Sequence, residues 1–252
     1  MPKPEIRVFR DLEELSQAAA TRFDELARAA AGKKGIFSAA LSGGSTPRRL
    51  FEILAAPPFV GNIPWEKVHL FQVDERSVPP DDPESNYRMT REALLSKAPL
   101  PADHFHRMAA ERDDRDRASR LYAQELTYVL KPPKGKLPRL DLILLGMGPD
   151  GHTASLFPRT AALQEKKLWV CANYVEKLKM HRLTLTFPVL NSGANILFLV
   201  AGADKAKVVR EVLEGPPGRY PAQRVRPARG KRGWFLDEAA ANLLRPKTRG
   251  GR

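Results

Sequence analysis

The chain lacks several features that define large classes of protein. Its 252 residues include a single cysteine, Cys171, which excludes an intramolecular disulfide and a cysteine-based metal cluster. No apolar run is long enough to span a bilayer, and the segment Met1–Arg7 has no apolar centre of the kind found in signal peptides. We therefore expect a soluble, cytoplasmic protein that makes no membrane contact.

Several common site motifs are missing or incomplete as well. No Gly-x-Ser-x-Gly sequence is present, so a serine-hydrolase triad would lack its usual nucleophile turn. The glycines at 43 and 44 are not followed by Gly-Lys-Ser/Thr, which argues against a nucleoside triphosphate. The segment 146–151 matches the dinucleotide pattern, but the next predicted strand ends without an acidic residue. His104 and His106 have a metal-like spacing without a partner carboxylate pattern, so we expect no metal.

Positive charge is concentrated near the carboxyl end. The formal net charge is +13, and the segment Gly218–Arg252 holds ten Lys and Arg against only Asp237 and Glu238. The other 217 residues carry about +5, which is ordinary for a soluble domain. The basic residues are not interleaved with aromatic ones, as a base-stacking surface would require. We expect no specific nucleic-acid partner.

Alternating strands and helices predict the fold. Asp11 begins a helix with Glu14 in the capping-box position, and Gly32 and Gly35 end it. Apolar runs predict further strands, and helical spacing predicts further helices. The predicted strands are 36–41, 68–73, 142–145, 169–172, 183–187 and 195–200; the predicted helices are 47–54, 85–96, 117–130, 203–213 and 237–244; the predicted loops include 215–218 and 224–233.

This alternation is typical of an α/β protein. We predict a single Rossmann-like domain over residues 5–245, with a mostly parallel sheet flanked by helices on both faces and room for a small lobe. Residues 246–252 are predicted to form a basic, flexible tail.

The turn after the strand 142–145 carries the strongest sign of chemistry. It is rich in Gly and Pro and contains a carboxylate and an imidazole two residues apart, Asp150 and His152. Ligands of parallel α/β sheets bind beyond the carboxyl ends of the strands. A histidine at such a place can exchange protons near neutral pH. We predict that this turn belongs to an active site.

Other strand ends carry candidate ligand-binding residues. The segment 42–47, Ser-Gly-Gly-Ser-Thr-Pro, fits a phosphate site at a helix N-terminus and equally fits a tight turn capped by Thr46. The segment 74–76, Asp-Glu-Arg, is suited to orient a substrate or to form a surface ion-pair cluster. Arg182 and Lys205 are each explained as solvated charges, but together with the glycine loop they would form a phosphate cage.

Taken in order, these motifs resemble those of the 6-phosphogluconolactonase family. The likeness extends from about Ile6 to Leu244 and rests on the segments 41–47, 73–76 with 85–87, 146–158, 182–188 and 234–237. It implies a Rossmann-like fold and an enzyme that needs no cofactor or metal. It also implies the reaction, hydrolysis of 6-phospho-D-glucono-1,5-lactone to 6-phosphogluconate in the pentose phosphate pathway. We expect a monomer.

Combined with the local chemistry, the resemblance implies a role for each candidate. His152 is the general base, Asp150 orients it, and Arg76 stabilises charge on the carbonyl. Asp74 binds sugar hydroxyls. The 6-phosphate is held by the glycine loop and two cations: Gly43, Gly44, Ser45, Thr46, Arg182 and Lys205.

Two other functions are compatible with parts of this pattern. Glucosamine-6-phosphate deaminases share the fold, and they look similar at the Asp-Gly-His turn, but they carry a Glu five residues after the histidine. Here that position is Phe157, which cannot accept a proton, and Arg76 also fits the lactonase pattern. A sugar-phosphate sensor would use the same cage but would not need His152. The basic tail after Pro246 has no counterpart in the family pattern.

Overall fold

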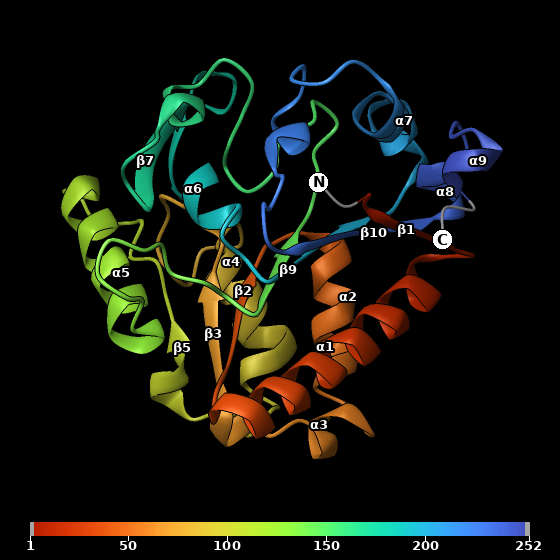
Figure 1. Ribbon diagram of the computed structural model, residues 1–252. Helices are drawn as coiled ribbons and strands as arrows, with labels where there is room; N and C mark the ends of the chain where they lie inside the picture. Colours follow the sequence, from red (N-terminus) through yellow and green to blue (C-terminus); the bar gives the residue numbers. More distant parts are fainter. Residues whose placement is uncertain (1–2, 250–252) are drawn as a thin grey trace.

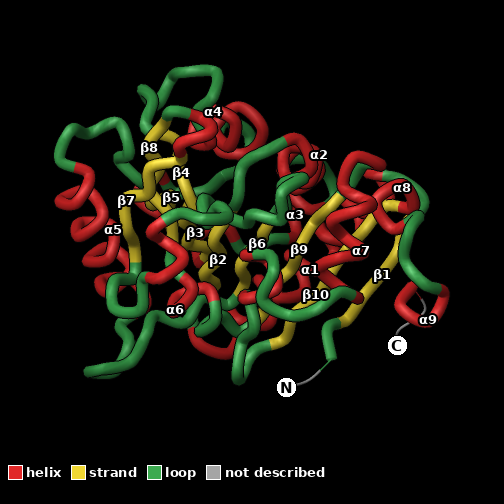
Figure 2. The backbone as a smooth tube through the Cα atoms, turned by 90° about the horizontal axis from the view of Figure 1, so that it is seen from above, coloured by secondary structure: helices red, strands yellow, loops and turns green. Residues whose placement is uncertain are grey.

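The computed structural model describes residues 3–249. Its centre is a seven-stranded sheet in the order β1-β10-β9-β6-β2-β3-β5, in which every neighbouring pair is parallel (Figures 1 and 2). The strands are β1 (Glu5–Phe9), β2 (Phe37–Leu41), β3 (Val68–Gln72), β5 (Phe105–His106), β6 (Leu142–Leu145), β9 (Asn195–Val200) and β10 (Lys231–Asp237). The predicted α/β class with a mostly parallel sheet is confirmed.

Helices cover both faces of this sheet, and each face has its own hydrophobic core. One core includes α1 (Leu12–Lys34), α2 (Ser45–Leu54), α3 (Phe59–Asn62) and α4 (Asn86–Thr90). The other includes α5 (Arg115–Leu130), α6 (Phe187–Leu190), α7 (Ala206–Glu214) and α8 (Glu238–Ala241). Residues of β6 alternate between the cores, since Leu142 and Leu144 join the first while Ile143 and Leu145 join the second. This alternation explains why the strand reads as a continuous apolar run.

The first helix begins where the sequence predicts, runs through Gly32 and ends at Gly35, the second of the two predicted glycines. The Asp11 carboxylate accepts a hydrogen bond from the Glu14 backbone N–H at 2.9 Å, and Gly35 ends α1 with a φ of 83°. A positive φ is accessible to glycine at little cost. The buried side of α1 carries Leu15, Ala19, Phe23 and Ala27, which pack on the sheet.

A second, antiparallel sheet forms the small lobe. Its order is β4-β8-β7, with β4 (Asp74–Arg76), β7 (Val170–Val175) and β8 (Met180–Leu185). Two of the predicted strands, 169–172 and 183–187, therefore belong to this lobe and not to the parallel sheet. The lobe joins the main sheet next to the site, because the Leu185 N–H donates to the Val73 carbonyl just beyond β3 at 2.8 Å.

Three strands of the main sheet, β1, the two-residue β5 and β10, escaped the sequence prediction. Residues 224–233 were expected to form a loop, but β10 starts within them at Lys231 and pairs with both β9 and β1. Lys and Arg at the start of β10, together with Gly233, hide its apolar pattern. The strand is fixed by long-range packing: the Trp234 ring stacks on Phe198 with 3.8 Å between centroids. β1 lies at the edge of the sheet, and its alternation of polar and apolar residues is too short to be recognised as a strand in the sequence.

The segment expected to form a tail begins with a helical turn. Residues Pro246–Arg249 form α9, a helical turn attached to the domain. The Glu214 carboxylate accepts hydrogen bonds from Arg245 Nε at 2.9 Å and from Thr248 Oγ1 at 2.5 Å. The Glu214 carboxylate of α7 thus contacts the start of this segment, and the flexibility of the tail stays a prediction. Residues 250–252 lie outside the described part of the chain.

The order of the strands places a crevice between β2 and β6. After β2 the chain builds β3 and β5 on one side, and then returns to place β6, β9 and β10 on the other side. The loops that follow β2 and β6 therefore leave the sheet in opposite directions. Such a switch point is where open α/β sheets bind ligands. Among residues 3–249, no helix has both the length and the apolarity needed to cross a membrane.

Candidate active site

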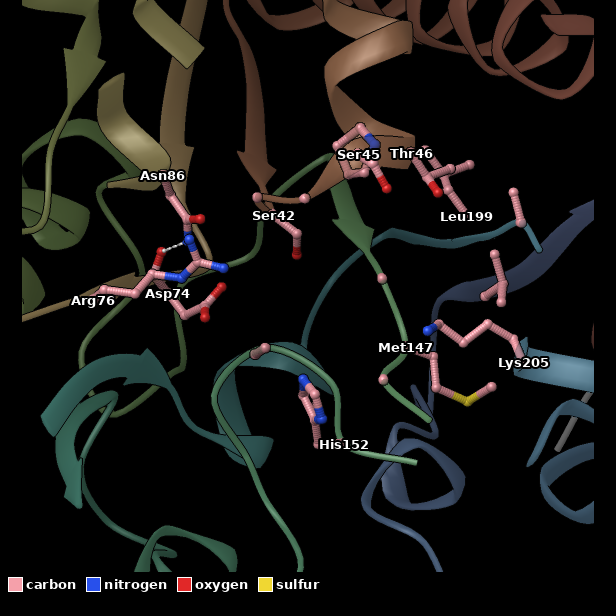
Figure 3. A pocket seen from close by; sticks show the side chains of 18 of the residues that line it. Ser42, Ser45, Thr46, Asp74, Arg76, Asn86, Met147, His152, Leu199 and Lys205 are labelled. Carbon is pink, nitrogen blue, oxygen red and sulfur yellow. Dashed lines mark hydrogen bonds between the residues drawn. The ribbon is translucent and has the colours of Figure 1, made fainter. Parts of the chain in front are cut away.

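A cavity of about 330 Å³ lies at this switch point, in the angle between the main sheet and the small lobe (Figure 3). Its wall combines the loops after β2, β6 and β9 with side chains of β4 and β8. Nine of the ten predicted site residues line it: Gly43, Gly44, Ser45, Thr46, Asp74, Arg76, His152, Arg182 and Lys205. The tenth, Asp150, contacts the cavity through His152.

His152 is held in one orientation by contacts on two sides. Its Nδ1 lies 2.5 Å from Asp150 Oδ1, and its ring stacks on Phe157 with 3.9 Å between centroids. Because a carboxylate accepts the Nδ1 proton, Nε2 is the nitrogen with a free lone pair. Partial burial favours a raised pKa for Asp150, but hydrogen bonds from His152 and Lys177 outweigh burial and hold that pKa well below its usual range. Asp150 is therefore a carboxylate near neutral pH.

The turn that carries this pair needs glycine at two places. A Cβ on Gly148 would lie 2.0 Å from Cε1 of the His152 ring, so only glycine lets the imidazole lie against the backbone there. Gly151 has a φ of 71°, which bends the chain between Asp150 and His152. The glycines of 146–151 thus shape a turn around the Asp–His pair, as the sequence predicted in preference to a dinucleotide site.

The segment 74–76 is a buried part of the site and not a surface ion-pair cluster. Glu75 is 2% exposed, and its carboxylate accepts backbone N–H bonds from Arg76 and Asn86 at 2.8 Å and from Tyr87 at 2.7 Å. This network ties β4 to the start of α4. Asp74 points to the cavity side, where its Oδ2 accepts a hydrogen bond from Ser155 Oγ at 2.6 Å.

Two arginines of the small lobe lie side by side at the cavity. Arg76 on β4 and Arg182 on β8 are directly opposite each other in the antiparallel ladder. The Nε atoms of both are buried and have no hydrogen-bond partner among the described residues. Burial lowers the pKa of Arg182 and the nearby Asp74 opposes that effect. Guanidinium groups with unused donors in a cavity are suited to bind an anionic group.

The loop after β2 brings a helix N-terminus to the cavity. Gly44, with a φ of 111°, precedes α2, which starts at Ser45 without a side-chain cap. Thr46 therefore is not the helix cap, and the alternative of a Thr-capped tight turn is wrong. The first N–H groups of a helix have no partner within the helix and attract anions. A Cβ on Gly43 would lie 1.8 Å from Asn86 Oδ1, so glycine is required for this close approach.

Lys205 faces these groups from the opposite side of the cavity, across from Arg76 (Figure 3). Its ammonium forms an ion pair with the exposed carboxylate of Asp204. The loop that carries both is fixed by Asp237 at the end of β10, which accepts hydrogen bonds from the Gly202 N–H at 3.0 Å and the Ala240 N–H at 2.7 Å. The segment 234–237 therefore supports the site without lining it.

Sequence reasoning left some lining residues out of the site. Asn86 contacts the cavity, and its side-chain amide donates to the Asp74 carbonyl at 2.9 Å. It belongs to the Ser85-Asn-Tyr87 segment, whose sequence indicates no particular chemistry for the asparagine. Ser42 also lines the cavity, where its hydroxyl donates to the Leu144 carbonyl at 2.9 Å and so links the loop after β2 to strand β6. Met147 also lines the cavity, and nothing in the sequence except its place in the turn after β6 indicates that it does.

The fold and the cavity define an α/β protein with a cavity lined by cationic side chains beside a carboxylate–imidazole pair. The chain belongs to the family described as glucosamine-6-phosphate isomerases/6-phosphogluconolactonase, whose sequence profile matches residues 10–234. It is 41% identical over 219 residues to a 6-phosphogluconolactonase of Synechocystis, covering 86% of this chain and 88% of the relative. The expected resemblance is confirmed.

Solved structures agree with this placement. The structure of 6-phosphogluconolactonase from Trypanosoma brucei superposes with a TM-score of 0.85 at 30% identity, over 96% of this chain and 99% of that one. A monomeric glucosamine-6-phosphate deaminase superposes with a TM-score of 0.79 at 22% identity, over 95% and 99% of the two chains, and this likeness shows the shared fold alone.

Proposed function

We propose that this protein hydrolyses 6-phospho-D-glucono-1,5-lactone to 6-phosphogluconate, the step that follows lactone formation in the pentose phosphate pathway. The observation that carries the proposal is the Asp150–His152 pair, 2.5 Å apart, at a cavity lined by Arg76, Arg182 and Lys205. A phosphorylated lactone needs a proton acceptor at one end and cations at the other. The relatives named 6-phosphogluconolactonase support the same reaction.

In this mechanism His152 moves the protons. Its Nε2 accepts a proton from a water molecule as the water oxygen attacks the lactone carbonyl carbon. The tetrahedral intermediate then collapses, the bond between that carbon and the ring oxygen breaks, and the imidazolium returns the proton to the ring oxygen. Asp150 stabilises the imidazolium and keeps its ring oriented. The products are the open-chain carboxylic acid and the regenerated imidazole.

Cations stabilise the two negative ends of the reacting molecule. Arg76, on the side of Asp74, is assigned to the oxyanion that develops on the carbonyl oxygen. The N-terminus of α2, Arg182 and Lys205 are assigned to the phosphate. Asp74 accepts hydrogen bonds from sugar hydroxyls. Binding the phosphate holds the reacting carbon near His152, which lowers the entropic cost of the reaction.

The deaminase alternative is disfavoured by what lies beside the base. Phe157 occupies the place where the deaminase pattern has a glutamate, and its buried ring is stacked on His152. A phenyl ring offers no second proton acceptor for opening an amino sugar. We therefore propose lactone hydrolysis and no deamination.

A coupled assay tests the proposal. Fresh 6-phosphogluconolactone is mixed with the purified protein, and the appearance of 6-phosphogluconate is followed with its dehydrogenase after correction for spontaneous hydrolysis. We expect saturable acceleration over the uncatalysed rate. Release of ammonia from glucosamine 6-phosphate at a comparable rate, or the absence of any acceleration, would overturn the assignment.

We also propose that the enzyme acts as a monomer in the cytoplasm. Light scattering of the active protein checks the oligomeric state. The location rests on the sequence arguments above, and imaging of the tagged protein in its own cell checks it.

A further inference from the structure

Lys177 lies outside the substrate cavity but contacts a residue of the site. It belongs to the short 3-10 turn Glu176–Leu178 that connects β7 to β8 in the small lobe. Its ammonium donates a hydrogen bond to Asp150 Oδ2, while Asp150 Oδ1 faces His152 Nδ1 at 2.5 Å. One carboxylate thus bridges a lysine of the small lobe and the imidazole of the main domain.

The lysine approaches this pair from the side away from the substrate. Asp150, Phe157 and Lys177 line a separate cavity of about 610 Å³, which does not include His152. The Lys177 ammonium lies 4.9 Å from the centroid of the Phe157 ring, and the imidazole of His152 stacks on that ring. Lys177 can therefore affect His152 only indirectly. It contacts Asp150 and Phe157, which both touch the imidazole, and its positive charge acts on the imidazole from a distance.

We propose that Lys177 is a positioning residue for catalysis, which anchors the second oxygen of Asp150 and whose charge opposes protonation of His152. The inference rests on the proposed role of His152 as the base. A general base must be neutral to work, and a bare carboxylate beside an imidazole stabilises the protonated, inactive form. A lysine that shares this carboxylate leaves the hydrogen bond between Asp150 and His152 in place and reduces the stabilisation of the protonated imidazole.

The charges around His152 fix the sign of the effect. Asp150 attracts a proton to the imidazole, and Lys177 opposes that attraction. The other charged side chains of the substrate cavity are unchanged by a substitution at 177: Asp74, Arg76, Arg182, Asp204 and Lys205. Loss of the lysine charge should therefore raise the pH at which the imidazole is half protonated. The Lys177 side chain is 52% exposed, so screening by solvent limits the rise to roughly 0.3–0.7 pH unit.

The test is a charge series at one position with a matched control. Lys177→Arg keeps the charge, Lys177→Gln removes it and Lys177→Glu reverses it. Lys179→Gln removes an exposed lysine from the same hairpin, and this side chain forms no ion pair among the described residues. For each variant, kcat and KM for the lactone are measured from pH 5 to 8. The titration of His152 is followed by NMR in the free protein and assigned by comparison with His152→Gln.

We expect the acid limb of the kcat profile and the His152 titration to move together. The shift should be upward by roughly 0.3–0.7 pH unit in Lys177→Gln, larger in Lys177→Glu and absent in Lys177→Arg and Lys179→Gln. KM should stay within about twofold, because Lys177 does not touch the substrate. A fall in kcat at all pH values without a shift in the profile would indicate a merely structural role and overturn the proposal.

The NMR titration distinguishes failure of this inference from failure of the proposed function. It needs no substrate, so an upward shift of the His152 titration in Lys177→Gln supports the coupling even in a protein without lactonase activity. A His152 titration that stays within 0.2 pH unit across the series overturns the coupling, even in a protein that hydrolyses the lactone.

Discussion

Arg76 and Arg182 occupy directly opposed positions on the antiparallel strands β4 and β8. Like charges at such positions destabilise a sheet, and neither buried Nε has a partner among the described residues. Asp74, two residues before Arg76, offsets part of the positive charge. An anionic ligand in the cavity would offset the repulsion between the two guanidinium groups. We therefore expect that the arginine pair serves binding and lowers the stability of the unliganded protein.

The first prediction concerns Arg182→Ala. If Arg182 binds the substrate phosphate, the substitution should raise KM by roughly 10- to 150-fold, since a charge-assisted hydrogen bond contributes about 1.5–3 kcal/mol. Unphosphorylated gluconolactone provides the control, because its slower hydrolysis should be little affected. An equal rise in KM with both lactones would mean that Arg182 acts on the lactone carbonyl, the role proposed for Arg76, and not on the phosphate. The melting temperature should not fall, because the variant removes one of two neighbouring like charges.

The second prediction concerns the glycine beneath the catalytic imidazole. A Cβ in Gly148→Ala would lie 2.0 Å from Cε1 of His152, so the ring must move away from Asp150 or Phe157. A displacement of about 1 Å at a catalytic group can cost on the order of 100-fold in rate. We expect kcat to fall by about that factor, with a nearly unchanged circular dichroism spectrum.

Gly32→Ala is the matched control for that experiment. It adds the same methyl group in α1, where nothing lies within 4 Å of the new atom. Its kcat should equal that of the native protein, and its stability should rise slightly because alanine favours a helix. Native turnover in Gly148→Ala would mean that the imidazole position seen here is not needed for the reaction.

The parts of the site that the sequence predicts are those that follow a strand. The loops after β2, β3, β6 and β9 were recognised because a buried apolar run followed by Gly, Asp or Ser is a local pattern. In a parallel sheet all these carboxyl ends meet at one edge, so residues more than 100 positions apart, such as Thr46 and His152, were expected in one place.

The parts that the sequence did not predict depend on long-range pairing. The opposition of Arg76 and Arg182 results from the register of β4 and β8, which no local pattern encodes. The contact between Asp150 and Lys177 likewise depends on where the β7–β8 hairpin folds against the main domain. β10 was missed because its first three residues are Lys, Arg and Gly, and its apolar half is stabilised by β1 and β9 on either side.

The third prediction is a loss of stability in mild acid, caused by a histidine cluster remote from the cavity. The rings of His69 and His104 stack with 3.9 Å between centroids, and His69 Nδ1 lies 3.1 Å from His106 Nε2. Burial, followed by the neighbouring histidines, lowers the pKa of His69 from 6.5 to about 4. Between these pH values the unfolded chain binds more protons than the folded one, so stability is full above pH 6.5 and falls as the pH drops toward 4.

Substitution of His69 by glutamine should weaken this pH dependence. Urea unfolding of the native protein at pH 7 and pH 4.5 should show a loss that is smaller in His69→Gln, by on the order of 1 kcal/mol after allowance for solvent screening of the partly buried ring. His181→Gln, which removes an exposed histidine of β8, should keep the native pH dependence. An unchanged slope in His69→Gln would assign the acid sensitivity to other groups.

The last prediction concerns the base itself. His152→Gln keeps a side chain of similar size that can still pack against Phe157, but its amide cannot accept a proton from water. General-base catalysis contributes about 10²–10⁴-fold, so kcat should fall by that factor while binding of 6-phosphogluconate and the circular dichroism spectrum persist. Because glutamine does not ionise, the residual activity of the variant should lack any pH dependence that the His152 imidazole imposes on the native enzyme. His181→Gln serves as the control for loss of a histidine. A folded His152→Gln protein with near-native kcat would remove His152 from the chemistry and leave Arg76, Arg182 and Lys205 as a binding site only.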